Sequence, residues 1–362
     1  MNAYLETLKN IYNNGFDHGD RTGTGRRSLY SQVMRFNMND GFPIVTTRRI
    51  PYKAAFEELF WFIKGSNNIK ELNDKNVHIW DSWAVDDNCI EEAISTIEAE
   101  DNDKEQLNKI ISEHFKGSIG PMYGYIWRHA PVSSGSTMKI YDVIPSFTDI
   151  ASDKLELFKK LYDETKPTHE GVEISFEDFA VSMSAQKIDQ LQNLILSLKR
   201  DPFSARHVMT AWLPEYIPIP GVSPKENVLS GKGALAPCHA FIQCFVTPGR
   251  DNKKNKLSLS LYQRSADFPV GSCFNIAQYA LLLHLLSHVC DMEPLELIYH
   301  TGDTHIYLNQ IELVEEQLKR EPLPLPKLKI NTEEKDLFKI KISDIEVIGY
   351  ESHPPIKYPI SV

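Results

Sequence analysis

The pattern of hydrophobic and polar positions along the 362-residue chain predicts a mixture of helices and strands. Near the N-terminus, apolar residues recur three or four positions apart and end before Gly15, which predicts an amphipathic helix over residues 4–12. Residues 28–36 then predict a strand, closed by the turn Asn39-Asp40-Gly41. The chain therefore opens with a helix followed by a strand.

Two segments are apolar on nearly every face and predict buried helices, at residues 51–64 and 276–290. The first carries two glutamates in its middle, and a carboxylate within an apolar helix has to be satisfied by some partner. We expect Glu57 to be exposed and Glu58 to be buried, because Glu58 directly precedes a run of apolar residues. The alternative for Glu58 is a structural ion pair with Lys53 or an arginine.

Three shorter runs predict strands of a sheet, at residues 208–212, 241–246 and 257–263. In the last of these, leucines alternate with serines, so one face is apolar and the other is small and polar. A sheet with such a face suits packing against a flat surface. Further patterns predict helices at residues 188–198 and 311–319 and a strand at residues 340–348.

Two segments carry no recognisable chemistry. Residues 86–105 hold nine acidic residues and one lysine, with isoleucines at helical spacing, which is typical of a solvated surface helix. Residues 132–186 are of mixed composition, and within them Asp153 and Glu156 form a capping-box pattern that predicts a helix over residues 153–162.

The composition indicates a globular protein, with 42% hydrophobic and 24% charged residues, and the length allows one large core or two modest ones. The net charge of −10 argues against a general nucleic-acid or membrane surface. It leaves room for a local cluster of arginines that binds one anionic ligand.

The cysteine and histidine patterns predict neither disulfides nor a metal site. The five cysteines, at positions 89, 238, 244, 273 and 290, form no close pair, and an odd count suits a reducing compartment. His284 and His288 are four residues apart but have no nearby third ligand. The N-terminus lacks a basic segment followed by an apolar one, and no run is expected to span a membrane. We therefore expect a cytoplasmic protein, or one in the host cytoplasm if the source is viral.

Cys238 is the leading candidate for catalysis, because it lies between Pro237 and His239 at the start of an apolar strand. A thiolate is a strong protein nucleophile, and proline fixes the backbone before it. The alternative is that Cys238 is one more buried small hydrophobe. A second candidate site is the loop at residues 19–27, whose three glycines and three arginines suit an oxyanion, with Arg21 as the proposed contact and a solvated turn as the alternative.

The ordered motifs of this chain resemble those of the thymidylate synthase family. The resemblance covers nearly the whole chain and rests on Asp20-Arg21-Thr22-Gly23-Thr24-Gly25, Glu58-Leu59-Phe60-Trp61-Phe62, Ile79-Trp80-Asp81, Gly120-Pro121-Met122-Tyr123-Gly124, Pro237-Cys238-His239, Gln263-Arg264-Ser265-Ala266-Asp267, Phe274-Asn275, Gly302-Asp303-Thr304-His305-Ile306-Tyr307 and Ser352-His353-Pro354-Pro355-Ile356-Lys357.

The fold that this resemblance implies is an α/β (α+β) fold, a single domain over residues 1–362 with a mixed, mostly antiparallel sheet flanked by helices. Residues 86–116 and 132–186 would be surface insertions, the second lying where shorter family members have almost no chain. The resemblance also implies a homodimer that packs sheet against sheet, with Arg206 reaching the partner's site.

The activity that the resemblance implies is reductive methylation of dUMP to dTMP, with 5,10-methylenetetrahydrofolate as cosubstrate and no metal. The residues that would be catalytic are Cys238, Glu58, Tyr123, Asn275, Asp267 and His239. The nucleotide would be bound by Arg21, Arg206, Arg264, Ser265, Gln263, Asn275, His305 and Tyr307. The folate would be bound by Trp80, Asp267, Trp83 and Val362.

Two departures from the family pattern keep an alternative open. Ala205 stands where the family usually has a second arginine, and Val270-Gly271-Ser272-Cys273 replaces the usual Leu-Gly-x-Pro. The alternative is a dUMP 5-hydroxymethylase, which would use the same folate with water in place of hydride. Trp80 and the full-length tail favour hydride transfer, because both help to exclude water. A nucleotide- or RNA-binding regulator without the reaction is less favoured, because Cys238, Glu58, Tyr123 and Asn275 are all present.

Overall fold

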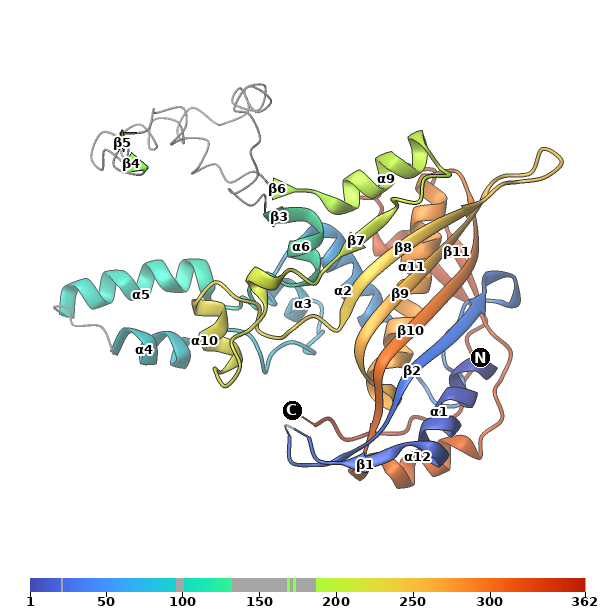
Figure 1. Ribbon diagram of the computed structural model, residues 1–362, viewed down its shortest axis with the longest axis horizontal. Coiled ribbons are helices and arrows are strands. Elements are labelled where there is room, and N and C mark those ends of the chain that lie inside the picture. The colour runs from blue at the N-terminus through green and yellow to red at the C-terminus, as the bar shows by residue number, and fades with distance from the viewer. Residues whose placement is uncertain (21, 96–100, 132–167, 170–171, 174–186, 362) are drawn as a thin grey trace. The chain divides into compact units, whose positions relative to one another are not determined.

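The computed structural model describes residues 1–20, 22–95, 101–131, 168–169, 172–173 and 187–361 (Figure 1). The chain forms two compact units, one of Met1–Trp127 with Gln190–Val362 and one of Arg128–Asp189. The organisation into a single domain stays a prediction.

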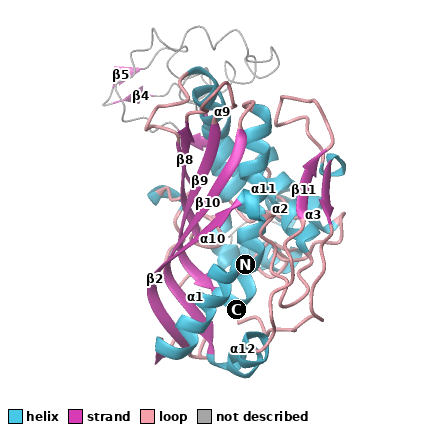
Figure 2. Ribbon diagram, turned by 90° about the vertical axis from the view of Figure 1, so that its right-hand side faces the viewer, coloured by secondary structure: helices cyan, strands magenta, loops and turns pink. Residues whose placement is uncertain are grey.

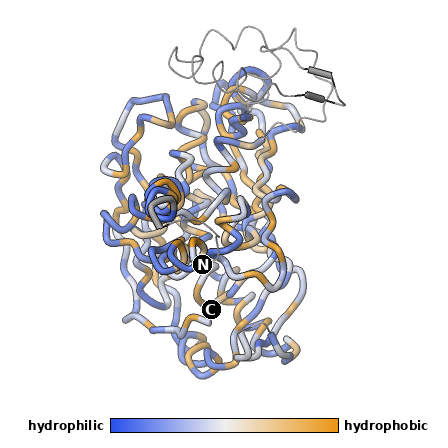
Figure 3. The backbone as a smooth tube through the Cα atoms, turned by 90° about the vertical axis from the view of Figure 1, so that its left-hand side faces the viewer, coloured by the Kyte–Doolittle hydropathy of each residue, from blue (hydrophilic) through white to orange (hydrophobic). Residues whose placement is uncertain are grey.

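Five helices of the larger unit lie where the apolar periodicity predicted them. They are α1 (Asn2–Asn14), α2 (Tyr52–Lys64), α9 (Gln190–Arg200), α11 (Cys273–Val289) and α12 (Ile311–Leu318). Three short helices were not predicted: α3 (Lys70–Asn73), α6 (Tyr123–His129) and α10 (Pro224–Leu229). Apolar and polar positions alternate along the described chain in Figure 3, as expected for elements with one buried face.

The prediction of a single acidic helix over residues 86–105 is wrong. The segment forms two helices, α4 (Asp87–Ser95) and α5 (Asp101–Phe115), and residues 96–100 lie outside the described part. Ile90 and Ile94 are buried on the inner face of α4, so apolar spacing holds within that helix.

A six-stranded sheet of the larger unit has the order β1-β2-β10-β9-β8-β7 (Figure 1). Its strands are β1 (Phe16–His18), β2 (Arg26–Asn37), β7 (Val208–Thr210), β8 (His239–Thr247), β9 (Lys256–Asp267) and β10 (Glu293–Tyr307). Neighbouring strands are antiparallel except for β10 and β9, which are parallel. The expected mixed, mostly antiparallel sheet flanked by helices is therefore confirmed, although β10 itself was not predicted.

The strand predicted over residues 340–348 is wrong in its first half. A 3₁₀ turn, Ile342–Asp344, occupies that part, because the Asp344 carboxylate accepts a hydrogen bond of 2.9 Å from the Lys341 backbone N–H. Only β12 (Ile345–Ile348) is a strand, and it pairs with β11 (Lys327–Ile330) in a separate two-stranded sheet.

Helix α11 forms the core beneath the sheet, with α2 on the same side (Figure 2). Every residue from Ile276 to Leu283 is buried, which explains why α11 is apolar on all faces. The stretch Phe268–Val289 is long and apolar enough to cross a membrane by length and composition, contrary to the expectation from sequence, but 78% of its apolar window is buried inside the fold. A helix in the core of a folded protein is expected to be apolar and buried in this way.

Helix α6 packs closely on α2 because of a glycine. A Cβ atom at Gly124 would lie 2.5 Å from the Cα atom of Phe62, closer than carbon atoms approach without displacement. The absence of a side chain at Gly124 therefore lets α6 bring Tyr123 next to the helix that carries Glu58.

In the smaller unit, β3 (Ala130–Pro131) pairs with β6 (Lys187–Ile188), and β4 (Thr168–His169) pairs with β5 (Val172–Glu173). Arg128 Nε and Asp189 Oδ2 form an ion pair of 2.7 Å. The helix predicted over residues 153–162 lies outside the described residues.

Candidate active site

Cys238 stands immediately before β8, at the strand entrance that the sequence predicted. Its backbone N–H donates a hydrogen bond of 2.9 Å to the Tyr123 hydroxyl, and its carbonyl accepts one of 2.9 Å from the Arg264 backbone N–H. The thiol is free and half-buried. Contacts from α6 and β9 therefore fix the backbone that carries the sulfur.

The Arg264 side chain holds the loop before Cys238. Its Nε donates to the Pro237 carbonyl at 2.9 Å, and its Nη2 donates to the Ala236 carbonyl at 2.6 Å. Burial raises the pKa of the Cys238 thiol, whereas the Arg264 charge and the hydrogen bond with Tyr123 lower it. Arg264 therefore offsets part of the cost of forming a thiolate.

Glu58 is buried in α2, as predicted, and both of its carboxyl oxygens accept hydrogen bonds. Oε1 accepts one of 2.7 Å from Trp80 Nε1, and Oε2 accepts one of 2.8 Å from Gln278 Nε2. Burial raises the pKa of Glu58 to about 7, against the lowering effect of the two hydrogen bonds. These neutral donors replace the ion pair that was the alternative from sequence. Glu57 is half-buried rather than exposed, because it pairs with Lys75.

Tyr123 connects the surroundings of Cys238 with those of Glu58. Its ring centroid lies 6.0 Å from that of Trp80 and 5.0 Å from that of His239. Burial raises the pKa of Tyr123 well above its ordinary value, so the hydroxyl stays protonated at neutral pH. Cys238, Tyr123, Trp80 and Glu58 thus form one continuous chain of contacts.

His239 and Asn275 are hydrogen-bonded to each other, and His239 lies next to Tyr123. Burial lowers the pKa of His239 to about 4, although a hydrogen bond with Asn275 raises it, so the imidazole is neutral near pH 7. The His239 ring also lies edge-on to Tyr279, with centroids 5.2 Å apart. Asn275, in the first turn of α11, is buried and held by His239.

Asp267 ends β9, and its surroundings differ from those of a surface carboxylate. Burial raises its pKa to about 6, while nearby His305 and a hydrogen bond from Gln310 lower it. Gln310 Nε2 donates to Asp267 Oδ2 at 3.3 Å, and the Val270 backbone N–H donates to Oδ1 at 3.4 Å. Gln310 was not identified from sequence, where it follows the motif at residues 302–307 without a signal of its own.

The end of β10 gathers His305, Tyr307 and Asp303. The rings of His305 and Tyr307 have centroids 5.2 Å apart, so the structure brings these two predicted residues together. Asp303 Oδ2 lies 2.8 Å from Arg26 Nη1, and His305 Nδ1 lies 3.4 Å from Asp303 Oδ1. Although burial raises the pKa of Asp303, the contacts with His305 and Arg26 hold it below its usual value. Sequence reasoning missed Arg26, although it belongs to the arginine-rich loop.

Gln263 and Ser265 lie on β9 on either side of Arg264. Gln263 Nε2 donates to the Ser265 carbonyl at 3.0 Å, and the Tyr299 hydroxyl donates to Gln263 Oε1. Gln263 is buried and Ser265 is half-buried. Both are therefore placed with Arg264 on the strand next to Cys238.

Arg206 is exposed in the loop between α9 and β7 and lies far from Cys238 of its own chain. The neighbouring His207 carbonyl accepts a hydrogen bond of 2.8 Å from the Cys244 backbone N–H. Cys244 is six residues from Cys238, which corresponds to about 20 Å along a strand.

Of the predicted folate contacts, Trp80 is buried and donates a hydrogen bond from its ring N–H to Glu58. Trp83 is half-buried, and its ring centroid lies 5.7 Å from that of Trp80. Arg21 and Val362 lie outside the described residues.

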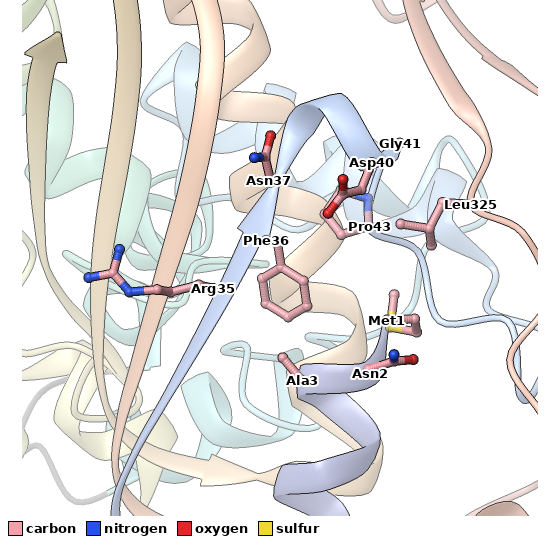
Figure 4. A pocket seen from close by; sticks show the side chains of 10 residues that line it. All are labelled: Met1, Asn2, Ala3, Arg35, Phe36, Asn37, Asp40, Gly41, Pro43 and Leu325. Carbon is pink, nitrogen blue, oxygen red and sulfur yellow. The ribbon is translucent and has the colours of Figure 1, made fainter.

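A pocket of about 210 Å³ lies where the start of α1 meets the end of β2 (Figure 4). Arg35 and Asp40 are the charged residues that line it, and Cys238 and Glu58 are not among its lining residues. Within the described ranges, no group of three or more His, Cys, Asp or Glu side chains is arranged to hold a metal ion. His288, one of the two histidines of α11, bonds instead to the Glu334 carbonyl at 2.9 Å.

A cysteine beside an arginine, a buried acid with a pKa of about 7 and a fixed neutral histidine–asparagine pair define an enzyme of the nucleophilic-catalysis class. The thymidylate synthase family matches residues 2–362 of the chain. Thymidylate synthases of Francisella tularensis subsp. holarctica, from strains FTNF002-00 / FTA and OSU18, are each 38% identical over 362 residues, which cover 100% of this chain and 100% of each relative. The chain belongs to the thymidylate synthase family, whose members are folate-dependent methyltransferases.

Proposed function

We propose that this enzyme catalyses the reductive methylation of dUMP to dTMP, with Cys238 as the nucleophile. The observation that carries the proposal is the chain of contacts from Cys238 through Tyr123 and Trp80 to the buried acid Glu58. It puts a nucleophile and a proton donor into one protein environment, as covalent addition to a pyrimidine requires.

In the proposed mechanism, the Cys238 thiolate attacks C6, the electron-poor carbon of the pyrimidine ring. A carbon–sulfur bond forms, and the electron pair of the C5–C6 double bond moves toward C5 and O4. Glu58 supplies a proton to O4 through water, work that suits a carboxyl whose pKa is about 7. Tyr123 assists the later removal of the C5 proton, and the carbon–sulfur bond then breaks to release Cys238 as the thiolate.

Asn275 would read the base. Its amide can donate to O4 and accept from N3–H, which is the pattern of uracil and not of cytosine. The hydrogen bond with His239 supports this role, because it holds the Asn275 amide in place. With a pKa of about 4, His239 remains neutral and places no charge beside the base near pH 7.

Arg264 would bind the phosphate together with Arg21, and Ser265 and Gln263 would assist from the same strand. Arg264 already lies against the Cys238 loop, so bound phosphate and thiolate would share its charge. His305 and Tyr307 would bind the sugar hydroxyl, since β10 brings their rings together.

The folate cosubstrate supplies the one-carbon unit and the hydride. Asp267 fits the N–H groups of a pterin ring, because it is a half-buried carboxyl that Gln310 and the Val270 backbone hold from the protein side. Trp80, Trp83 and the C-terminal Val362 would complete the folate site and exclude water from it.

The enzyme would act as a homodimer that packs sheet against sheet. The outer face of the sheet carries exposed Val33, Phe241, Phe245 and Tyr262, with exposed fractions of 39–68%. In the sheet register Phe241 is paired with Tyr262, so the two rings lie on the same face. Exposed apolar patches of this kind mark interaction surfaces. Arg206 is next to His207, which bonds to Cys244 about 20 Å along β8 from Cys238, and would then serve the site of the partner.

Product identification tests the proposal. We expect dTMP and dihydrofolate from dUMP and methylenetetrahydrofolate, measured by mass spectrometry and by the absorbance of dihydrofolate. Hydroxymethyl-dUMP without dihydrofolate would favour the hydroxymethylase, in which water replaces hydride and the folate remains reduced. The Cys238→Ser variant should bind dUMP but form neither product, because a serine hydroxyl is far less ionised than a thiol. Turnover by that variant would contradict covalent catalysis.

A further inference from the structure

Gln278 is a fully buried glutamine on α11 that faces α2. Its Nε2 lies between two acceptors, 2.8 Å from Glu58 Oε2 and 3.5 Å from the Ala55 carbonyl oxygen. Its Oε1 is buried and has no hydrogen-bond partner within the described residues.

The two acceptors fix the direction of the Gln278 amide. A rotated amide would place Oε1 against both the Ala55 carbonyl and Glu58 Oε2, so the side chain is held as a donor toward Glu58. This orientation leaves Oε1 unpaired, which costs free energy in a buried site. A methionine of similar length would fill the space without that cost, so packing alone does not account for a glutamine here.

The other groups around Glu58 are neutral. Trp80 donates to Oε1, and Tyr123 of α6 and Tyr279 of α11 are tyrosines whose hydroxyls burial keeps protonated. Neither a cation nor a second carboxylate pairs with Glu58 in the part of the chain that the structure describes. Trp80 and Gln278 are therefore the two donors that stabilise the ionised form of Glu58 against burial.

We propose that Gln278 is a positioning residue for proton transfer: together with Trp80 it fixes the plane of the Glu58 carboxyl group and sets the pH at which Glu58 releases its proton. Each donor occupies one carboxyl oxygen, so the transferable proton has to reside on a lone pair that points away from both. The role in catalysis rests on the proposed function, whereas the effect on Glu58 itself does not.

Infrared titration of the ligand-free enzyme measures the protonation of Glu58 directly, with Glu58→Gln to assign the signal. In Gln278→Met we expect the midpoint to move upward by about one to two pH units, because a hydrogen bond to a charged group is lost. The matched control is Gln317→Met, which removes another fully buried glutamine, bonded to Thr47 and Tyr358, and should leave the Glu58 midpoint unchanged. An unchanged midpoint in Gln278→Met overturns the inference.

The pH profile of kcat tests the catalytic part. If Glu58 gives its proton to O4, activity falls on the alkaline side, and this limb should move to higher pH in Gln278→Met while KM for dUMP stays within about twofold. A purely structural role would lower kcat equally at every pH, and that result overturns the proposal. A shifted infrared midpoint with an unshifted kinetic limb overturns the role of Gln278 in proton transfer. It does not affect the proposed reaction at Cys238, which product identification tests separately.

Gln278→Asn provides a second variant if Gln278→Met does not fold. It keeps the amide but shortens the side chain by one methylene group, which withdraws the amide nitrogen from Glu58 Oε2. We expect an upward shift of the Glu58 midpoint here as well, and no shift overturns the inference.

Discussion

Gln310 links Asp267 to the C-terminal segment: its Nε2 lies 3.3 Å from Asp267 Oδ2 and 3.0 Å from the Pro359 carbonyl oxygen. Its Oε1 accepts a hydrogen bond of 3.1 Å from the Tyr307 backbone N–H. One fully buried amide therefore connects the proposed pterin ligand with the end of β10 and with the tail.

Gln310→Leu should weaken folate binding about tenfold at pH 7, since one hydrogen bond to a carboxylate is lost. Burial already raises the pKa of Asp267 to about 6, and loss of the Gln310 donor raises it further, so more of the carboxyl is protonated at pH 7. The deficit should shrink at pH 8.5, in titrations of the dUMP complex with folate. Gln317→Leu serves as the control, and equal losses in both variants would contradict a specific link.

Glu58→Gln should change the pH dependence of stability. Burial raises the pKa of Glu58 from 4.5 to about 7, so the folded protein binds this proton more tightly than the unfolded chain does. That contribution is present below pH 4.5 and is lost as the pH rises through 7, which corresponds to roughly 3 kcal/mol. The unfolding free energy of Glu58→Gln relative to the parent enzyme should therefore increase between pH 4.5 and pH 8, as measured by denaturant unfolding. A constant difference across this range would show that the pKa is not raised.

The sequence predicted the reactive groups better than the groups that hold them. Cys238 and Glu58 stand out locally, one between a proline and a histidine and the other before an apolar run. The glutamines that hold the two acids are distant in sequence: Gln278 is 220 residues from Glu58, and Gln310 is 43 residues from Asp267. No local pattern reveals such contacts. Each glutamine is a single amide in a segment whose periodicity indicates only a helix or a turn.

The sequence predicted a helix or strand correctly where one hydrophobic pattern ran through the whole element. Helix α11 is apolar on all sides because it is buried on all sides, so its sequence was unambiguous. Strand β10 was missed because Gly302, Asp303 and Thr304 interrupt its apolar pattern. A Cβ at Gly302 would lie 2.8 Å from the Arg264 carbonyl oxygen, so the glycine that weakens the strand pattern allows the close approach of β9.

Asn275→Asp should lower kcat/KM for dUMP and raise it for dCMP, with a change in their ratio of about a hundredfold. A carboxylate can only accept hydrogen bonds, whereas cytosine presents an amino donor at C4. The new charge would also lie beside His239 and raise its pKa from about 4. Competition assays with the two nucleotides measure the ratio, and an unchanged ratio would mean that Asn275 does not read the base.

Phe245→Asp should dissociate the proposed dimer. The Phe245 side chain lies on the outer face of the sheet and is 68% exposed in the single chain, and an unpaired carboxylate buried there should raise the dimer dissociation constant by about a hundredfold or more. Sedimentation velocity over a range of concentrations gives this constant. Ile110→Asp, at a 54% exposed position on α5, is the control and should remain a dimer. A Phe245→Asp dimer as tight as the parent would exclude the sheet face as the interface.

Ala205→Arg should tighten dUMP binding by about tenfold, or about 1.4 kcal/mol, by restoring a phosphate contact. Ala205 and Arg206 are both exposed in the loop before β7, and the carbonyl of Ala205 accepts from Gln243 Nε2 at 3.4 Å, so the backbone is already anchored. A new guanidinium would stand next to Arg206, which reaches the partner's site in the proposed dimer, without displacing a core residue. Calorimetric titration of the dimer with dUMP measures the gain, and Ala205→Gln, similar in length but uncharged, is the control. Unchanged or weaker binding of Ala205→Arg would show that another cation already occupies this place or that position 205 does not face the phosphate.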